Sequence, residues 1–307
     1  MDFLGRHIIS SIDFTREEVE HLLDTAIHIE NNKEKYVKIA EGKILATLFF
    51  EASTRTRLSF ETSMLRLGGT YIGFSSEDVS STKKGETIVD TIKTISNYAD
   101  IIIMRHSLDG TAKLASKFSK VPIINAGSGS GEHPTQSLLD LLTIRSLKGK
   151  IDGLSIGLIG DLKNGRTTHS LSYLLSLYNV NLYFISPDAL SMQYRVKDVL
   201  QRRGCFYKET NKFKKTLPEL DVIYMTRVQK ERFTDPDEYE KLKNSYILEE
   251  EDLKSIKDDA IILHPLPRVN EISAAVDKDP RAKYFEQTYY GVLLRKALLA
   301  LILGLIK

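Results

Sequence analysis

The sequence predicts an α/β protein with two doubly wound parallel-sheet domains joined by interdomain helices. Three observations carry this prediction. Short apolar runs rich in β-branched residues alternate with helical patterns, which is typical of parallel sheets covered by helices on both faces. The runs form two sets of four, within residues 43–127 and 154–265. A chain of 307 residues is also longer than most single domains.

The first helix is marked by a capping box and by apolar spacing. Thr15 and Glu18 form the box, and the apolar residues on one face are Val19, Leu22, Leu23, Ala26 and Ile27. Strands are expected at 43–50, 70–75, 99–105 and 121–127, and again at 154–161, 181–187, 221–227 and 259–265. A second clear helix begins at Pro134 and runs to Leu147, before a Gly- and Lys-rich break at 148–153.

The domain boundaries follow from these elements. We expect a first domain over residues 1–133 and a second over 134–288, with a C-terminal helix over 289–307 that packs back on the first domain. The last 18 residues are nearly all apolar, but Arg295 and Lys296 interrupt them. Because a membrane-spanning helix needs about 20 apolar residues, we interpret this segment as a helix packed by protein.

Composition limits the function classes. The net charge of +2, from 43 basic and 41 acidic residues, excludes a whole-molecule field that would attract nucleic acid or a membrane. Anion recognition must therefore be local. The single cysteine, Cys205, excludes an internal disulfide and a cysteine-based zinc site, and it is typical of a reducing compartment. We expect a cytoplasmic protein.

The densest polar segment follows the first strand. Ser53, Thr54, Arg55, Thr56 and Arg57 are consecutive and precede a helical pattern. In a parallel sheet this place combines free N–H groups with the positive end of a helix dipole. Ser53 can cap the helix while the threonines and arginines donate to a doubly charged oxyanion, so a phosphate is expected. The alternative is simple capping beside solvated arginines. The Walker and dinucleotide-binding glycine patterns are absent.

Three further strand ends carry reactive side chains. Arg105 follows the third apolar run, and a glycine-rich loop delivers His133 and Gln136 into the next helix. His264 and Arg268 follow the last run. A lone histidine is more often structural than catalytic, so His264 is interpreted as structural. Together with the first segment, these residues predict one pocket rim.

Seven segments carry a family resemblance. In chain order they are "FFEASTRTRLSFE", "SSTKKGET", "MRHS", "EHPTQSLLD", "GDLKNGRTTHSL", "YMTRVQKERF" and "HPLPRVNEI". This ordered set resembles the aspartate/ornithine carbamoyltransferases, and within them the catalytic chains that use aspartate. The resemblance extends over almost the whole sequence.

The resemblance implies a reaction and a set of roles. The reaction is carbamoyl transfer from carbamoyl phosphate to the α-amino group of L-aspartate, an early step of pyrimidine biosynthesis that needs no metal and no cofactor. Thr56, Arg105 and His133 would polarise the carbonyl, with Gln136 near the carbamoyl nitrogen. The carbamoyl phosphate-binding set comprises Ser53, Thr54, Arg55, Thr56, Arg105, His133, Gln136, Leu266 and Pro267. The aspartate-binding set comprises Lys84, Arg166, Arg227 and Gln229.

The resemblance also bears on partners. In the family, Ser80 and Lys84 would reach the neighbouring subunit's site, which implies a homotrimer with shared active sites. Some members bind a separate zinc-containing regulatory chain, and the sequence leaves that partner open. Asn164 and Asn270 depart from residues common in the family, which puts any transfer of subunit-coupling contacts in doubt.

Other functions remain as alternatives. Ornithine carbamoyltransferases resemble one another in a His-Cys-Leu-Pro segment, whereas this chain has Pro265 in place of that cysteine. Arg166 and Arg227 also favour a dicarboxylate. A non-catalytic anion-binding or amino-acid-binding protein would use the same arginines but has no need for both His133 and Gln136. A dehydrogenase is disfavoured by the absent glycine pattern.

Overall fold

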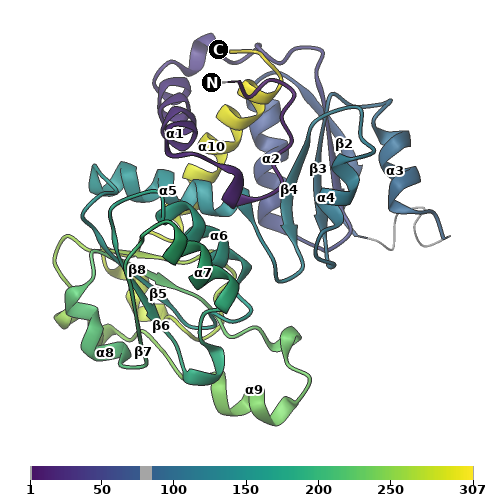
Figure 1. Cartoon of the computed structure of the whole chain (residues 1–307). Helices are drawn as coiled ribbons and strands as arrows, with labels where there is room; N and C mark the ends of the chain where they lie inside the picture. The colour runs from purple at the N-terminus through teal and green to yellow at the C-terminus, as the bar shows by residue number, and fades with distance from the viewer. Residues whose placement is uncertain (1, 77–84, 307) are drawn as a thin grey trace. The chain divides into compact units, whose positions relative to one another are not determined.

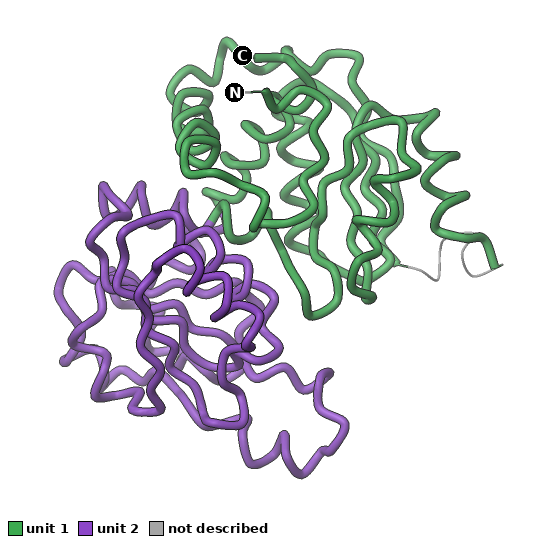
Figure 2. The backbone as a smooth tube through the Cα atoms, in the orientation of Figure 1, with its two compact units in different colours: residues 1–139, 289–307 green, residues 140–288 purple. Residues whose placement is uncertain are grey.

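The computed structural model describes residues 2–76 and 85–306. The chain forms two compact units (Figure 2): residues 1–139 with 289–307 make unit 1, and residues 140–288 make unit 2. The expected boundary at 133/134 falls at the first residue of α5 (Pro134–Lys148), whereas the units divide inside this helix. A C-terminal helix, α10 (Glu286–Ile302), also runs across a unit boundary.

Unit 1 contains a parallel sheet whose described strands follow the order β2-β1-β3-β4 (Figure 1). Its strands are β1 (Ile44–Phe49), β2 (Thr70–Phe74), β3 (Ile101–His106) and β4 (Ile123–Ser128). Besides α10 and the start of α5, its helices are α1 (Arg16–Asn31), α2 (Thr54–Arg66), α3 (Ile88–Ile95) and α4 (Thr111–Ser116). Chain crossovers leave β1 in both directions, so the strand order reverses between β1 and β3.

The unit 1 sheet is covered on both faces. Ala46 and Leu48 of β1 pack in one core with Ile92 of α3 and Ala115 of α4. Thr47 points to the other face, where its hydroxyl donates to Glu61 of α2 at 3.1 Å. Since successive strand residues face opposite sides, α2 lies across the sheet from α3 and α4. The doubly wound arrangement is confirmed in this unit.

The C-terminal helix packs back on unit 1, as predicted. Lys296 forms a buried ion pair with Glu30 of α1 at 2.7 Å, and Arg295 donates to Ser59 of α2 at 2.8 Å. The Gly5 N–H also donates to the Ile302 carbonyl at 2.9 Å, which brings the two ends of the chain together (Figure 1). Among the described residues, none of the helices combines the length and apolar character needed to cross a bilayer.

The first helix forms as its sequence predicts, with one difference. Thr15 accepts from the Glu18 N–H and the Glu18 carboxylate accepts from the Thr15 N–H, which completes the capping box of α1. Ile29 rather than Ile27 is buried on the inner face. The other four predicted residues, Val19, Leu22, Leu23 and Ala26, are buried as expected.

Unit 2 contains a parallel sheet whose described strands follow the order β7-β6-β5-β8-β9. The strands are β5 (Ser155–Ile159), β6 (Asn181–Ile185), β7 (Tyr207–Thr210), β8 (Val222–Met225) and β9 (Ile261–Leu263). Besides α5 and the start of α10, its helices are α6 (Arg166–Leu175), α7 (Tyr194–Arg202), α8 (Phe213–Thr216) and α9 (Pro236–Leu242). The sequence analysis missed β7, because this edge strand exposes Lys208 and Glu209 and lacks an apolar run.

The unit 2 sheet is also covered on both faces. Ile159 and Ile223 pack in a core with Phe213 of α8, while the hydroxyl of Tyr224 donates to Asp140 of α5 at 2.8 Å. Ile223 and Tyr224 are consecutive, so α5 and α8 lie on opposite faces. In this sheet the strand order reverses between β5 and β8. Ligands of open α/β sheets bind at the carboxyl ends of the strands beside such a reversal.

Candidate active site

The segment Ser53–Thr56 lies at the reversal point of the unit 1 sheet. Ser53 is the N-cap of α2 by position, with extended backbone, but its side chain makes no capping hydrogen bond. The expectation that the Ser53 hydroxyl caps the helix is therefore wrong. Thr54 and Arg55 are exposed, whereas Thr56 is buried. The first turn of α2 thus places hydroxyls, a guanidinium and the N–H groups of a helix start at the end of β1.

Arg105 lies beside this segment on the neighbouring strand. It pairs in register with Phe49, the last residue of β1, and its Nη2 donates to the Glu51 carboxylate at 2.6 Å. The Arg105 side chain is only 11% exposed, so its charge lies in a largely dry environment next to the Glu51 carboxylate. Sequence reasoning named Arg105 but missed Glu51, although Glu51 precedes the polar segment directly.

His133 and Gln136 arrive from the next strand along the sheet. His133 is buried before the first residue of α5, and Gln136 is half-buried in its first turn. Hydrogen bonds hold the glycine-rich loop before them in place. Asp109 accepts from the Gly131 N–H at 2.9 Å, and Glu132 accepts from the Ser10 hydroxyl at 2.6 Å.

The loop also leaves no room for larger residues. Gly129 has φ +49°, and a Cβ at this position would lie 2.1 Å from the Asp109 carboxylate. Glu132 accepts a second hydrogen bond, from the Ser11 N–H at 2.7 Å. Hydrogen bonds therefore hold the loop on the side of His133. Unit 1 carries Ser53–Thr56, Arg105, His133 and Gln136 at the ends of three adjacent strands, whereas Leu266 and Pro267 belong to unit 2.

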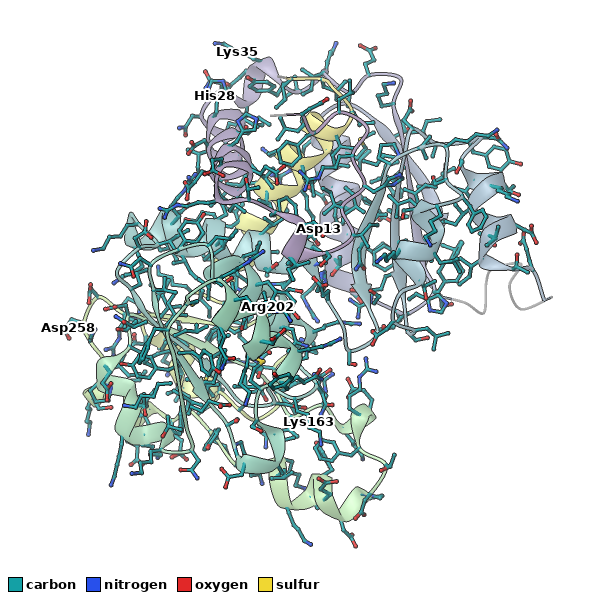
Figure 3. The ribbon with its side chains drawn as sticks, viewed as in Figure 1. Asp13, His28, Lys35, Lys163, Arg202 and Asp258 are labelled. Carbon is teal, nitrogen blue, oxygen red and sulfur yellow. The ribbon has the colours of Figure 1, made fainter. Side chains whose placement is uncertain are left out.

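In unit 2, Arg166 is the first residue of α6 and follows the end of β5. The segment before it is organised by Asp161, which is fully buried. The Asp161 carboxylate accepts from the Asn164 N–H at 3.0 Å and from the Gln229 N–H at 3.4 Å. Burial raises the pKa of Asp161, against the lowering effect of these hydrogen bonds. Lys163, labelled in Figure 3, is exposed on the same segment.

Arg227 follows β8 and is held by an acidic residue one helical turn away. Both of its terminal nitrogens donate to Glu231, one at 3.0 Å and the other at shorter range. Burial disfavours the charged guanidinium, but hydrogen bonds and charge from Glu231 outweigh it and raise the pKa of Arg227. Arg166 therefore follows β5, and Arg227 and Gln229 follow the neighbouring strand β8, on either side of the strand-order reversal.

Leu266 and Pro267 lie on the loop after β9, next to β8. Leu266 has φ +54°, in the left-handed region, and its N–H donates to His264 Nδ1 at 2.7 Å. His264 Nε2 lies 2.6 Å from the Glu271 carboxylate, and both side chains are buried. The interpretation of His264 as structural agrees with its burial.

Two predicted residues fall outside this description. Ser80 and Lys84 lie outside the described residues, so their predicted role between subunits stays a prediction. The two residues that depart from the family pattern have local partners: Asn164 donates to Asp161, and Asn270 donates to Asn244.

The residues that sequence reasoning missed are all carboxylates that hold a donor in place: Glu51, Asp109, Glu132, Asp161, Glu231 and Glu271. One sequence signal was available, because Arg227 and Glu231 are four residues apart. Among the described residues, no group of three or more histidine, cysteine or acidic side chains could hold a metal ion.

Comparisons with known proteins find the same family over both halves of the chain. The model of the aspartate/ornithine carbamoyltransferase carbamoyl-P binding domain matches residues 6–146, and that of the Asp/Orn binding domain matches residues 152–302. The chain is 52% identical to the aspartate carbamoyltransferase catalytic subunit of Thermococcus onnurineus over 100% of both chains. It is 53% identical to that of Clostridium novyi over 98% of both.

Solved structures give the same result. The catalytic subunit of M. jannaschii aspartate transcarbamoylase has a TM-score of 0.88 and 50% identity, with 96% of each chain covered. An aspartate transcarbamoylase from Trypanosoma cruzi, solved with carbamoyl phosphate and aspartate, has a TM-score of 0.93 and 39% identity, with 98% of each chain covered. With both domain models matched and identity above 50% over the full length, this chain belongs to the aspartate/ornithine carbamoyltransferase family.

Proposed function

We propose that groups at the carboxyl edge of the unit 1 sheet, together with Leu266 and Pro267, bind carbamoyl phosphate, and that groups at the carboxyl edge of the unit 2 sheet bind L-aspartate. The activity is that of an aspartate carbamoyltransferase, which forms N-carbamoyl-L-aspartate and phosphate in an early step of pyrimidine biosynthesis. The observation that carries the activity is the 52% identity over the full length to a catalytic subunit of that name. The gathering of donors at both strand-order reversals supports the assignment of roles.

The phosphate group fits the start of α2. Ser53, Thr54 and Thr56 offer hydroxyl donors there, and Arg55 offers a planar fork that matches phosphate oxygens. The N–H groups of the first helical turn and the helix dipole add positive potential at the same point. These groups bind the phosphate in both the substrate and the product.

The carbamoyl group requires donors for its oxygen. Thr56, Arg105 and His133 fill this role, and Gln136 lies near the carbamoyl nitrogen. The deprotonated α-amino group of aspartate attacks the carbonyl carbon, and negative charge grows on the oxygen of a tetrahedral intermediate. The bond between carbon and the bridging phosphate oxygen then breaks. Phosphate leaves with the amine proton, so the groups of the chain act mainly by positioning and charge neutralisation.

Aspartate supplies two carboxylates and needs cationic partners. Arg166, at the start of α6, and Arg227, after β8, provide guanidinium forks, and Gln229 provides an amide beside Arg227. Lys84 adds an ammonium group in the proposed site. Ornithine carries a cationic side chain, which these arginines would repel.

The proposed assembly is a homotrimer in which Ser80 and Lys84 enter the neighbouring subunit's site. Unit 1 has a surface that fits such contacts, because the edge strand β2 exposes Tyr71 and Ile72. If sites are shared, mixing Arg55→Ala chains with Lys84→Ala chains will restore part of the activity, since some sites then contain neither substitution. Activity no higher than that of the two variants measured separately would contradict the shared site.

We also propose a cytoplasmic location, which fits the single cysteine. A separate regulatory chain would need a second apolar surface, and Leu108, Leu114 and Phe118 are exposed around α4. The net charge of +2 gives no support to nucleic-acid or membrane binding.

One assay tests the activity. Purified chain is given carbamoyl phosphate with either L-aspartate or L-ornithine, and both ureido product and released phosphate are measured. We expect equal amounts of product and phosphate with aspartate and neither with ornithine. Turnover with ornithine would favour the related transferase, and substrate binding without turnover would favour a binding protein.

A further inference from the structure

The loop from His264 to Glu271 closes around two buried side chains. His264 is 2% exposed and Glu271 is 4% exposed, and His264 Nε2 lies 2.6 Å from Glu271 Oε1. The other carboxylate oxygen, Oε2, accepts from the N–H groups of Val269 and Asn270, both at 3.1 Å. A buried carboxylate with three donors can remain ionised, and it ties both ends of the loop together.

The hydrogen bonds assign the tautomer of His264. The Leu266 N–H is a donor and points to Nδ1 at 2.7 Å, so Nδ1 carries no proton. Nε2 must then carry the proton that is donated to Glu271. Burial lowers the pKa of His264 although Glu271 opposes the shift, which agrees with a neutral ring. The imidazole therefore accepts a hydrogen bond at Nδ1 and donates one at Nε2.

The acceptor nitrogen of the His264 ring, Nδ1, bonds to a residue with an unusual backbone conformation. Leu266 has φ +54°, a conformation that side-chain-bearing residues rarely adopt. The hydrogen bond from its N–H to His264 holds the chain in that conformation. With this N–H occupied and no N–H on Pro267, the backbone of these two residues can offer a ligand only carbonyl oxygens.

The His264 backbone is itself anchored in the core of unit 2. Its N–H donates to Gln287 Oε1 at 3.0 Å, and Gln287 Nε2 donates to Asp140 Oδ1 at 2.6 Å. The Tyr224 hydroxyl donates to the other oxygen of Asp140 at 2.8 Å. This chain of buried hydrogen bonds fixes the ring from which the loop is held.

We propose that His264 is a positioning residue of the carbamoyl transfer, whose Nδ1 holds the Leu266 backbone in its substrate-binding conformation and whose tautomer is set by Glu271. The inference rests on the proposed function and on the carbamoyl phosphate-binding role that the family resemblance implies for Leu266 and Pro267. Neither His264 nor Glu271 touches substrate in this account. Both act through Leu266.

Two substitutions at His264 test the roles of the two ring nitrogens separately. In His264→Asn, the amide oxygen stands near the place of Nδ1 and can still accept from the Leu266 N–H, but the donor to Glu271 is lost. In His264→Gln, the longer side chain keeps a donor for Glu271 but loses the acceptor for Leu266. We expect His264→Gln to raise the KM for carbamoyl phosphate about tenfold and His264→Asn to change it little.

A substitution at Glu271 tests the tautomer. In Glu271→Gln, the amide oxygen will face the two backbone N–H groups, so its NH₂ group will face His264 Nε2. The ring must then carry its proton on Nδ1, which opposes the Leu266 N–H. The KM for carbamoyl phosphate should rise about tenfold in this variant. In the double variant His264→Asn with Glu271→Gln, the increase should disappear, because an amide has no tautomer to change.

A purely structural role predicts a different pattern. All three single variants would then lose thermal stability, and the KM would be the same in each of their folded fractions. Equal KM values for carbamoyl phosphate in His264→Asn and His264→Gln would overturn the inference, provided that the wild-type chain turns over. A wild-type chain without turnover would instead contradict the proposed function, and the positioning role would fall with it.

Discussion

The carboxyl edges of the two sheets present similar cationic side chains but hold them by different means. In unit 1, Arg105 Nη2 donates to Glu51, and the neighbouring donors lie on the first turn of α2. In unit 2, Glu231 binds both terminal nitrogens of Arg227, and buried Asp161 and Glu271 organise the adjacent loops. Carboxylates orient the arginines at both edges, but Glu51 follows the strand next to that of Arg105, whereas Glu231 lies only four residues after Arg227 in the chain. The experiments below test that contrast.

The largest effect is expected from Arg105→Ala. Removing one donor to a developing oxyanion costs roughly 3 to 4 kcal/mol of barrier, so kcat should fall about 10²-fold to 10³-fold in a folded protein. Steady-state kinetics and a thermal melt measure the two quantities. Arg202→Ala is the matched control, because Arg202 is exposed on α7 and pairs only locally with Asp198 (Figure 3). Near-normal turnover of Arg105→Ala would remove the arginine from the mechanism.

Glutamine substitutions at the two acidic partners sharpen the contrast. Glu231→Gln should raise the KM for aspartate about tenfold, because Arg227 loses the charge and one of the acceptors that orient its fork. Glu51→Gln should instead lower kcat about tenfold, because Arg105 acts on the carbonyl. Separate titrations of the two substrates distinguish these effects. If both variants changed the same kinetic constant, the two edges would not differ as described.

The buried pair in unit 2 also predicts a pH dependence of stability. Burial lowers the pKa of His264 below its ordinary value of 6.5, against the opposing effect of Glu271. Between the lowered pKa and 6.5 the unfolded chain binds more protons, so the free energy of unfolding rises with pH across that range.

His264→Gln should lack this part of the rise. Urea unfolding of both proteins at several pH values measures the difference. Burial also lowers the pKa of His7, but His7 is present in both proteins and its contribution cancels. If the free energy of unfolding changed with pH in the same way in both proteins, His264 would not be a buried neutral ring.

The smallest effect lies away from both edges. Thr15→Ala removes the N-cap of α1 and should cost about 1 kcal/mol of unfolding free energy. It should leave kcat and both KM values unchanged. Chemical denaturation and steady-state kinetics on one preparation measure both. A change in either KM would mean that α1 influences a sheet edge, against the present account.

Much of the fold was predictable because buried parallel strands have a strong apolar signal. The runs around Leu45, Ile102, Ile156 and Ile223 all became strands, and the capping box at Thr15 began α1 as predicted. The strand β7 was missed since its residues are largely exposed, so burial imposes no apolar pattern on them. The apolar pattern of a sequence therefore predicts edge strands less well than central strands.

The candidate site was predictable in its donors but not in the groups that orient them. Arg105 and Arg227 could each be placed because the carboxyl ends of the strands of a parallel sheet lie along the same edge of that sheet. Glu51 and Glu271 could not, because an acidic residue in a loop has the same sequence signal whether it is solvated or bonded to a buried partner. The Ser53 hydroxyl was wrongly expected to cap α2, since helical position alone does not settle which groups a side chain contacts.

The most direct test is a crossed measurement of both KM values in Arg55→Ala and Arg166→Ala. We expect Arg55→Ala to raise only the KM for carbamoyl phosphate and Arg166→Ala to raise only the KM for aspartate. A rise in the KM of the same substrate in both variants, or no rise in either, would contradict the assignment of Arg55 to carbamoyl phosphate and of Arg166 to aspartate.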